Sequence, residues 1–165
     1  MNTILKDTYL VFKLDKNYFA FPVGIVEVVV RMVAIKDIPR SYESVIGVIG
    51  FRGKIIPVID FRKILGLEKR RIFINDHIVI IDHDDGHFAV IVDQIKEVKS
   101  IKTEMMVRLE DVLENRSLKF SITEMPKGII IVNNPESILE GMDFTSLSQD
   151  LTKGNYGSHI ELGEN

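Results

Sequence analysis

The sequence predicts a mainly β fold built from two similar lobes, and three observations favour this class. The chain holds 17 Val and 24 Ile against 12 Leu and 3 Ala. Residues branched at Cβ favour strands, whereas Leu and Ala favour helices. Short apolar runs alternate with turn residues, as they do in barrels and sandwiches. The first half of the chain also recurs in the second half, which predicts two copies of one β unit.

Seven segments have the length and composition of β-strands. Two pairs of them form predicted hairpins, because Asp15-Lys16-Asn17 and Asp84-Asp85-Gly86 supply the turn hydrogen bonds and the positive φ that tight turns need. In chain order the predicted strands are residues 9–14, 18–23, 45–50, 54–59, 78–82, 88–93 and 128–132.

Two short helices are predicted between and after these strands. Asp60 is placed to cap a helix over residues 61–65, and Gly66 is suited to end it. Residues 107–115 form the second candidate, because three of their apolar residues are spaced roughly for one helical face.

The internal repeat appears when the sequence is shifted by 69 residues, and later by 74. The alternative is that two unrelated β-hairpins look alike. Neither half is large enough to bury much core alone, so two lobes are expected to pack on one another, with a crevice suited to a ligand or a partner helix. The matching segments are 9–12 with 78–81, 19–20 with 88–89, 55–58 with 129–132, and 64–65 with 138–139.

Composition excludes several classes of protein. The formal net charge is −3, whereas domains that bind nucleic acid through phosphate contacts are usually basic. The chain has no Cys, which excludes disulfides, thiolate metal sites and thiol catalysis. No apolar run approaches the roughly 20 residues of a spanning helix, and the N-terminus lacks the layout of a signal peptide. These features predict a cytoplasmic protein.

One polar cluster contains metal-ligand residue types. The run 82–87 holds His83, Asp84 and His87, and imidazole with carboxylates can bind a divalent ion. A metal- or small-ligand-binding β protein is therefore the alternative function. The competing interpretation is a hydrated hairpin turn, because the equivalent turn of the first half carries no His.

Other candidate motifs carry little chemistry. The chain contains no nucleophile motif, zinc-protease motif or phosphate loop. The apolar run 23–30 cannot hide all its residues on one face of a strand, so it either offers apolar surface to a partner or is buried on both faces.

Residues 47–62, Gly-Val-Ile-Gly-Phe-Arg-Gly-Lys-Ile-Ile-Pro-Val-Ile-Asp-Phe-Arg, resemble the CheW-like domain of bacterial chemotaxis coupling proteins. The family pattern is roughly Gly-Val-Ile-Asn-Leu-Arg-Gly, one variable residue, then Ile-Val-Pro-Val-Val-Asp-Leu-Arg. Residues 90–98 are similar to the family's Val-Val-Asp-x-Val-x-x-Val strand. The resemblance runs from about Tyr9 to Leu139.

The resemblance implies two SH3-like five-stranded β-barrels packed side by side around a shared apolar core. It also implies a scaffold without catalytic activity or cofactor, which joins the cytoplasmic tips of chemoreceptors to the regulatory domain of the CheA histidine kinase. In the family, the receptor's helical hairpin lies in the groove between the barrels, and kinase contacts use exposed barrel ends.

The resemblance also implies a set of partner-binding residues. Arg52 matches the family's receptor-facing Arg, Val26 matches an apolar groove position, and Phe51 replaces a Leu. Gly47 and Gly53 match glycines whose role is in the turn rather than in contact.

Three positions depart from the family pattern. Val28 replaces a Glu, Gly50 replaces the Asn before Leu-Arg-Gly, and Pro135 follows an Asn pair where the family enters a helix directly. Val28 and Gly50 therefore mark where this chain's partner contacts are expected to differ from the family's.

The expected organisation is one domain over residues 1–150. Its first lobe spans about 15–82, and its second about 9–14 plus 83–145. The remaining residues, 151–165, are rich in Gly and Asn and are expected to form a flexible tail.

Overall fold

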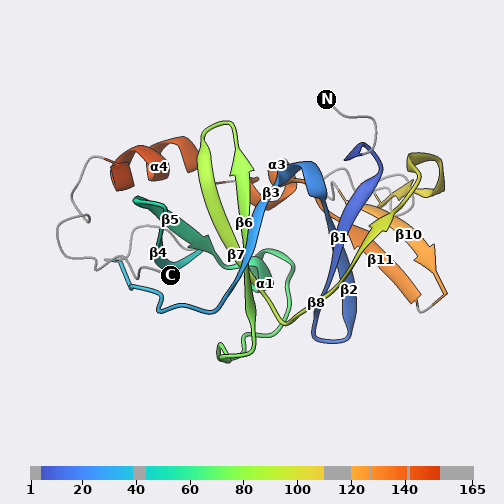
Figure 1. Cartoon of the computed structure of the whole chain (residues 1–165), viewed down its shortest axis with the longest axis horizontal. Coiled ribbons are helices and arrows are strands. Elements are labelled where there is room, and N and C mark those ends of the chain that lie inside the picture. Colours follow the sequence, from blue (N-terminus) through green and yellow to red (C-terminus); the bar gives the residue numbers. More distant parts are fainter. Residues whose placement is uncertain (1–4, 39–43, 110–119, 127, 141, 153–165) are drawn as a thin grey trace.

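The computed structural model describes residues 5–38, 44–109, 120–126, 128–140 and 142–152. Its order of elements confirms the mainly β fold with short helices (Figure 1). The elements are β1 (Thr8–Leu14), β2 (Asn17–Pro22), β3 (Val26–Arg31), β4 (Val45–Phe51), β5 (Lys54–Ile59), α1 (Phe61–Ile64), β6 (His77–His83), β7 (Gly86–Val92), β8 (Gln94–Ser100), β9 (Val107–Arg108), β10 (Ser121–Met125), β11 (Gly128–Val132), α3 (Pro135–Leu139) and α4 (Phe144–Thr152).

The strands form two sheets. The five-stranded sheet has the order β3-β6-β7-β5-β4, and the six-stranded sheet has the order β8-β1-β2-β11-β10-β9. Figure 1 shows them side by side, with β4 to β7 in one body and β1, β2, β10 and β11 in the other. Both predicted hairpins are present as β1–β2 and β6–β7. The six-stranded sheet exceeds the expected five strands because β9 adds to its edge.

The two repeats exchange their hairpins. The β6–β7 hairpin of the second repeat pairs with β3 and β5 of the first, and the β1–β2 hairpin of the first pairs with β8 and β11 of the second. The registers are equivalent: Val58 lies opposite Ala89 in the parallel pair of one sheet, and Val132 lies opposite Ala20 in the other. The repeat is therefore a property of the fold as well as of the sequence.

The expected lobe boundaries differ from these sheets. A lobe of residues 15–82 would take β2 and leave out β7, whereas β2 pairs in the six-stranded sheet and β7 in the five-stranded sheet. The physical reason is that a tight antiparallel hairpin is joined along its whole length, so β1 with β2, and β6 with β7, enter a sheet as units.

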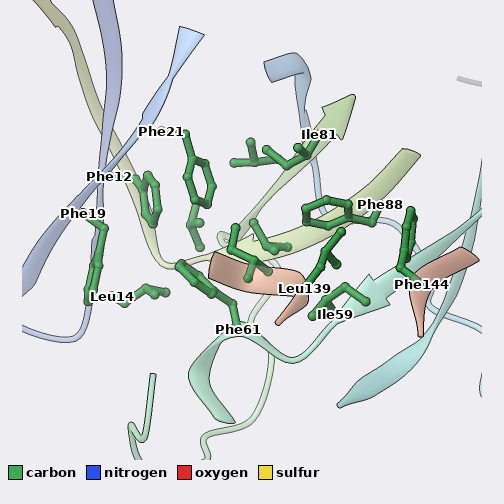
Figure 2. Packing of buried hydrophobic residues seen from close by; sticks show 14 of the residues in the cluster. Phe12, Leu14, Phe19, Phe21, Ile59, Phe61, Ile81, Phe88, Leu139 and Phe144 are labelled. Atoms are coloured by element: carbon green, nitrogen blue, oxygen red, sulfur yellow. The ribbon is translucent and has the colours of Figure 1, made fainter. Parts of the chain in front are cut away.

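A shared apolar core joins the two sheets. Phe12 and Phe21 of the β1–β2 hairpin pack with ring centroids 4.7 Å apart, and Phe88 of β7 lies 5.6 Å from Phe144 of α4 (Figure 2). Phe61 of α1 contacts the first group, 5.6 Å from Phe21. A second apolar cluster lies on the other face of each sheet. Most central strands are consequently buried on both faces, which explains their nearly continuous apolar sequences.

The helix predictions had mixed outcomes. The short helix capped by Asp60 is confirmed, because its carboxylate accepts a hydrogen bond from the Lys63 amide at 3.1 Å and Gly66 follows with φ +70°. The helix predicted over 107–115 is wrong at its start, because Val107 and Arg108 pair with β10 as strand β9. Residues 110–115 lie outside the described residues.

The predicted start of the tail is also wrong. Leu151 and Thr152 end α4, and the side chain of Leu151 is buried in the shared core. Its apolar contacts explain why this segment is helical rather than flexible. Residues 153–165 lie outside the described residues. No helix in the described ranges combines the length and the apolar character needed to cross a membrane.

Candidate partner-binding site

Arg52 lies at the tip of the β4–β5 hairpin, in a two-residue turn. Phe51 and Lys54 close the ladder, and Arg52 and Gly53 between them have φ of +48° and +75°. Positive φ at both central residues is the geometry of the hairpin turn that matches strand twist, and Asn-Gly is its preferred sequence. Gly53 suits this turn, whereas an Arg at the first position adopts a conformation that most side chains disfavour.

The side chain of Arg52 is held on the surface by two contacts. Its Nη1 lies 2.9 Å from Oε1 of Glu27, and its guanidinium lies 4.7 Å from the ring centroid of Phe51. The side chain of Arg52 is 67% exposed. A guanidinium of fixed orientation and high exposure can recognise a carboxylate or a backbone carbonyl of a partner.

Glu27 reaches Arg52 because of a β-bulge. The pairing between β3 and β6 shifts between Val26 and Val28, so Glu27 is the extra residue of β3. Its second carboxylate oxygen lies 4.0 Å from Nε2 of His87. This contact was not predicted, although Glu27 is the one charged residue in the apolar run 23–30 and could have drawn attention to it.

The remaining predicted site residues are less accessible. Val26 is half-buried against the shared core, and Val28 is half-buried against the separate cluster of the five-stranded sheet. Phe51 also packs on that second cluster, and Gly50 pairs with Ile55 within the sheet. The valines of β3 thus divide between two clusters, which favours burial on both faces over an open apolar patch.

Gly47 has a close neighbour. A Cβ at this position would lie 2.5 Å from the carbonyl oxygen of Lys36 and 2.7 Å from Cγ2 of Ile35. Lys36 pairs with Val48 through two backbone hydrogen bonds of 2.9 Å each. Gly47 therefore lies within β4 and not, as the resemblance had implied, in the turn, and its lack of a side chain permits residues 35–36 to pair beside β4.

The structure separates the proposed metal-ligating residues. Asp82 and His87 lie opposite each other on β6 and β7, so alternation directs His83 to the other face of the hairpin. There the ring of His83 packs edge-on against Phe144 at 5.7 Å, and its Nδ1 accepts a hydrogen bond from the Asp85 amide. Within the described residues, His87 groups with Glu27 and Asp82, and neither His83 nor Asp84 belongs to that group.

A second polar centre joins the two sheets. Arg62 of α1 donates hydrogen bonds to Asp93 at 2.6 and 2.8 Å and to Asp15 in the β1–β2 turn at 2.9 Å. Asp93 lies between β7 of one sheet and β8 of the other. It also accepts from Arg70, which donates to the buried Asp76 at 2.8 and 2.9 Å. These five residues form the charged cluster.

The charged cluster shifts two pKa values. Burial by itself raises the pKa of Asp93, but hydrogen bonds from Arg62, the Asp15 amide and Arg70, with the Arg62 charge, outweigh it and hold that pKa below its usual value. The hydrogen bond to Asp76 is the largest influence on the pKa of Arg70, which is raised. Both groups are thus charged near neutral pH.

The cavity beside the charged cluster is small. Its volume is about 110 Å³, and its lining includes Ile59, Phe61, Arg62 and Asp93. Small-molecule sites usually have roughly 300–1,000 Å³. This space fits a few waters rather than a metabolite, so it favours a structural role for the charged cluster.

Three comparisons connect this geometry to known proteins. The family model described as "CheW-like domain" matches residues 8–141. Chemotaxis protein CheW of Thermotoga maritima is 43% identical over 58 residues, which are 35% of this chain and 38% of that protein. Chemotaxis protein CheW of Helicobacter pylori is 22% identical over 133 residues, 80% of this chain and 81% of that protein.

A solved structure agrees with the fold. The crystal structure of scaffolding protein TtCheW from Thermoanaerobacter tengcongensis matches with a TM-score of 0.68 and 30% identity, covering 76% of this chain and 87% of that one. The fold class expected from the resemblance is confirmed. Because the family model covers most of the sequence, the chain belongs to the CheW-like domain family.

Proposed function

We propose that this protein is a non-catalytic chemotaxis adaptor that couples the cytoplasmic tips of chemoreceptors to the regulatory domain of the CheA histidine kinase. Membership of the CheW-like family and the likeness to a scaffolding protein support an adaptor role. Receptor tips and kinase are cytoplasmic, so this role belongs in the cytoplasm. The cavity beside the charged cluster is too small for a typical substrate, which agrees with a binding role.

One observation carries the assignment of Arg52 to the binding surface. This residue occupies a left-handed backbone position that Asn or Gly would fill at lower cost, and it presents a largely exposed guanidinium. A disfavoured backbone conformation that the fold maintains supports a functional role for its side chain. Phe51 beneath the guanidinium and Glu27 beside it fix its direction.

Arg52→Asn is expected to separate binding from folding. Asn suits the turn at least as well as Arg, and exposed ion pairs contribute little, so the free energy of unfolding should change by less than about 1 kcal/mol. Affinity for a receptor-tip fragment or the kinase regulatory domain should fall about tenfold or more, equivalent to about 1.4 kcal/mol. Isothermal titration calorimetry with each purified partner measures the affinity, and urea unfolding measures the stability.

Charge reversal gives a second variant with a matched control. Arg52→Glu should weaken binding further. The control is Lys96→Glu, which makes the same charge change on an exposed residue in the bulge of β8, the counterpart in the other sheet of the bulge in β3. This control should bind normally. Unchanged affinity in both Arg52 variants would remove Arg52 from the interface. Absence of binding by the unchanged chain to either partner would contradict the proposed function itself.

A further inference from the structure

Glu27, Asp82 and His87 converge from three neighbouring strands at one point on the five-stranded sheet. Asp82 and His87 are cross-strand partners on β6 and β7, and the bulge of β3 brings Glu27 beside them. Nε2 of His87 lies 3.7 Å from a carboxylate oxygen of Asp82 and 4.0 Å from one of Glu27. All three donor atoms lie within 4.8 Å of one another.

These distances exceed a hydrogen bond but approach the spacing of metal ligands. Hydrogen bonds between N and O are usually no longer than about 3.2 Å, so His87 Nε2 is not hydrogen-bonded to either carboxylate. Donor atoms at about 2.0–2.1 Å from a tetrahedral Zn²⁺ are about 3.4 Å apart. The two distances from His87 exceed that spacing by about 0.3 and 0.6 Å, and the carboxylate oxygens of Glu27 and Asp82 lie within 4.8 Å of each other, so side-chain rotation of up to about 1.4 Å would bring the three atoms to that spacing.

We propose that Glu27, Asp82 and His87 form a surface site for a divalent transition-metal ion such as Zn²⁺, with water completing its coordination. One imidazole and two carboxylates are ligands that suit Zn²⁺ or Ni²⁺, whereas Mg²⁺ and Ca²⁺ take oxygen ligands. The strands fix the backbone of all three residues, so only side-chain rotation is needed. With Arg52 the site carries a formal charge of −1, which a divalent cation reverses.

Arg52 is the built-in competitor of the ion. Its guanidinium occupies one carboxylate oxygen of Glu27 at 2.9 Å. A bound cation repels the guanidinium and takes electron density from the same carboxylate, so Arg52 and the metal oppose each other. This consequence rests on the proposed function, in which Arg52 binds a partner. Metal binding would release Arg52 from Glu27 and so change the affinity of the protein for receptor or kinase.

The test is titration of the tag-free chain with Zn²⁺ at constant pH. The chain has no Cys, so thiolates do not contribute. Calorimetry should show one site, and a free concentration about ten times Kd should raise Tm by roughly 3–6 °C, reversibly with a chelator. Mg²⁺ should give no shift, because the site lacks the all-oxygen ligands of that ion.

Variants assign the site. His87→Gln should abolish the Zn²⁺-induced shift, whereas His83→Gln, on the opposite face of the same hairpin, and His159→Gln should keep it. Arg52→Ala should tighten Zn²⁺ binding severalfold, because the competitor is gone. Absence of a shift in the unchanged protein, or a shift that survives His87→Gln, would overturn the proposal. These measurements contain no partner, so their failure is distinct from failure of the adaptor function.

Discussion

Replacing Asp93 with Asn is expected to lower the free energy of unfolding by about 2–4 kcal/mol. Asp93 is 19% exposed and accepts from Arg62, from Arg70 and from the Asp15 amide. Asn keeps the shape but loses the charge, so two guanidinium groups would meet around a neutral amide. The loss affects contacts that tie the β1–β2 turn and the β7–β8 connection to α1, so both sheets are weakened together. Urea unfolding followed by circular dichroism measures it.

The pH dependence of stability gives an independent test. The pKa of Asp93 is held below its usual value, so the folded state releases this proton more readily than the unfolded chain does. Its stabilising effect is therefore complete above the unfolded pKa of about 4 and is lost as pH falls through the folded pKa. The unchanged protein should lose stability below about pH 4, and Asp93→Asn should lack part of that loss.

Asp84→Asn is the matched control for Asp93→Asn. Asp84 lies at the exposed tip of the β6–β7 turn. The same substitution there is expected to change the free energy of unfolding by no more than about 0.5 kcal/mol. Equal urea midpoints for the two variants would show that the charged cluster contributes nothing to stability. If Asp93→Asn loses as much stability below about pH 4 as the unchanged protein does, other carboxylates account for the acid-induced loss of stability.

Local chemistry explains which parts of the fold could be predicted from the sequence. The hairpin turns at 15–17 and 84–86 depend on residues within a few positions of each other, and the structure confirms both hairpins. Asp60 likewise caps a helix that begins at the next residue. The same logic could have found α4, because Phe144, Leu147 and Leu151 have helical spacing and Asp143 accepts from the Ser146 amide at 3.1 Å.

The exchange of hairpins could not be predicted in the same way. A repeat at a constant shift has the same sequence pattern whether each hairpin joins its own repeat or the other one. The choice depends on which sheet buries Phe12 and Phe21, and on whether β11 pairs with β2 or with β7. Those contacts link residues about a hundred positions apart, which strand periodicity does not report.

The candidate site, like the fold, could be predicted only in part from the sequence. The resemblance selected Arg52 and the composition of the 82–87 run selected His87. The sequence marks Glu27 only as the one charged residue of the run 23–30, and it does not place Glu27 between Arg52 and His87. The bulge that exposes Glu27 appears only when β3 pairs with β6. The structure does not bring together the alternative metal ligands His83 and His87. In a hairpin with a two-residue turn, cross-strand partners share a face and are an odd number of positions apart, so residues four positions apart lie on opposite faces.

Gly47→Ala is expected to lower the free energy of unfolding by about 2–3 kcal/mol. The new Cβ would lie 2.5 Å from the backbone carbonyl oxygen of Lys36, which accepts a hydrogen bond from the Val48 amide. Relief of the overlap requires residues 35–36 to move away from β4, and that movement weakens both hydrogen bonds between Lys36 and Val48. Thermal or urea unfolding with circular dichroism measures the loss.

Gly24→Ala shows whether the effect of Gly47→Ala comes from the close contact or from glycine itself. Among the described residues, and apart from its two chain neighbours, no atom lies within 4 Å of a Cβ built at Gly24. Ala there should therefore change stability by no more than about 0.5 kcal/mol, or raise it by restricting the unfolded chain. Equal stabilities for the two variants would show that residues 35–36 can withdraw from β4 without cost. A large loss only at Gly47 would mean that the glycine is needed so that residues 35–36 can pair beside β4, rather than for contact with a partner.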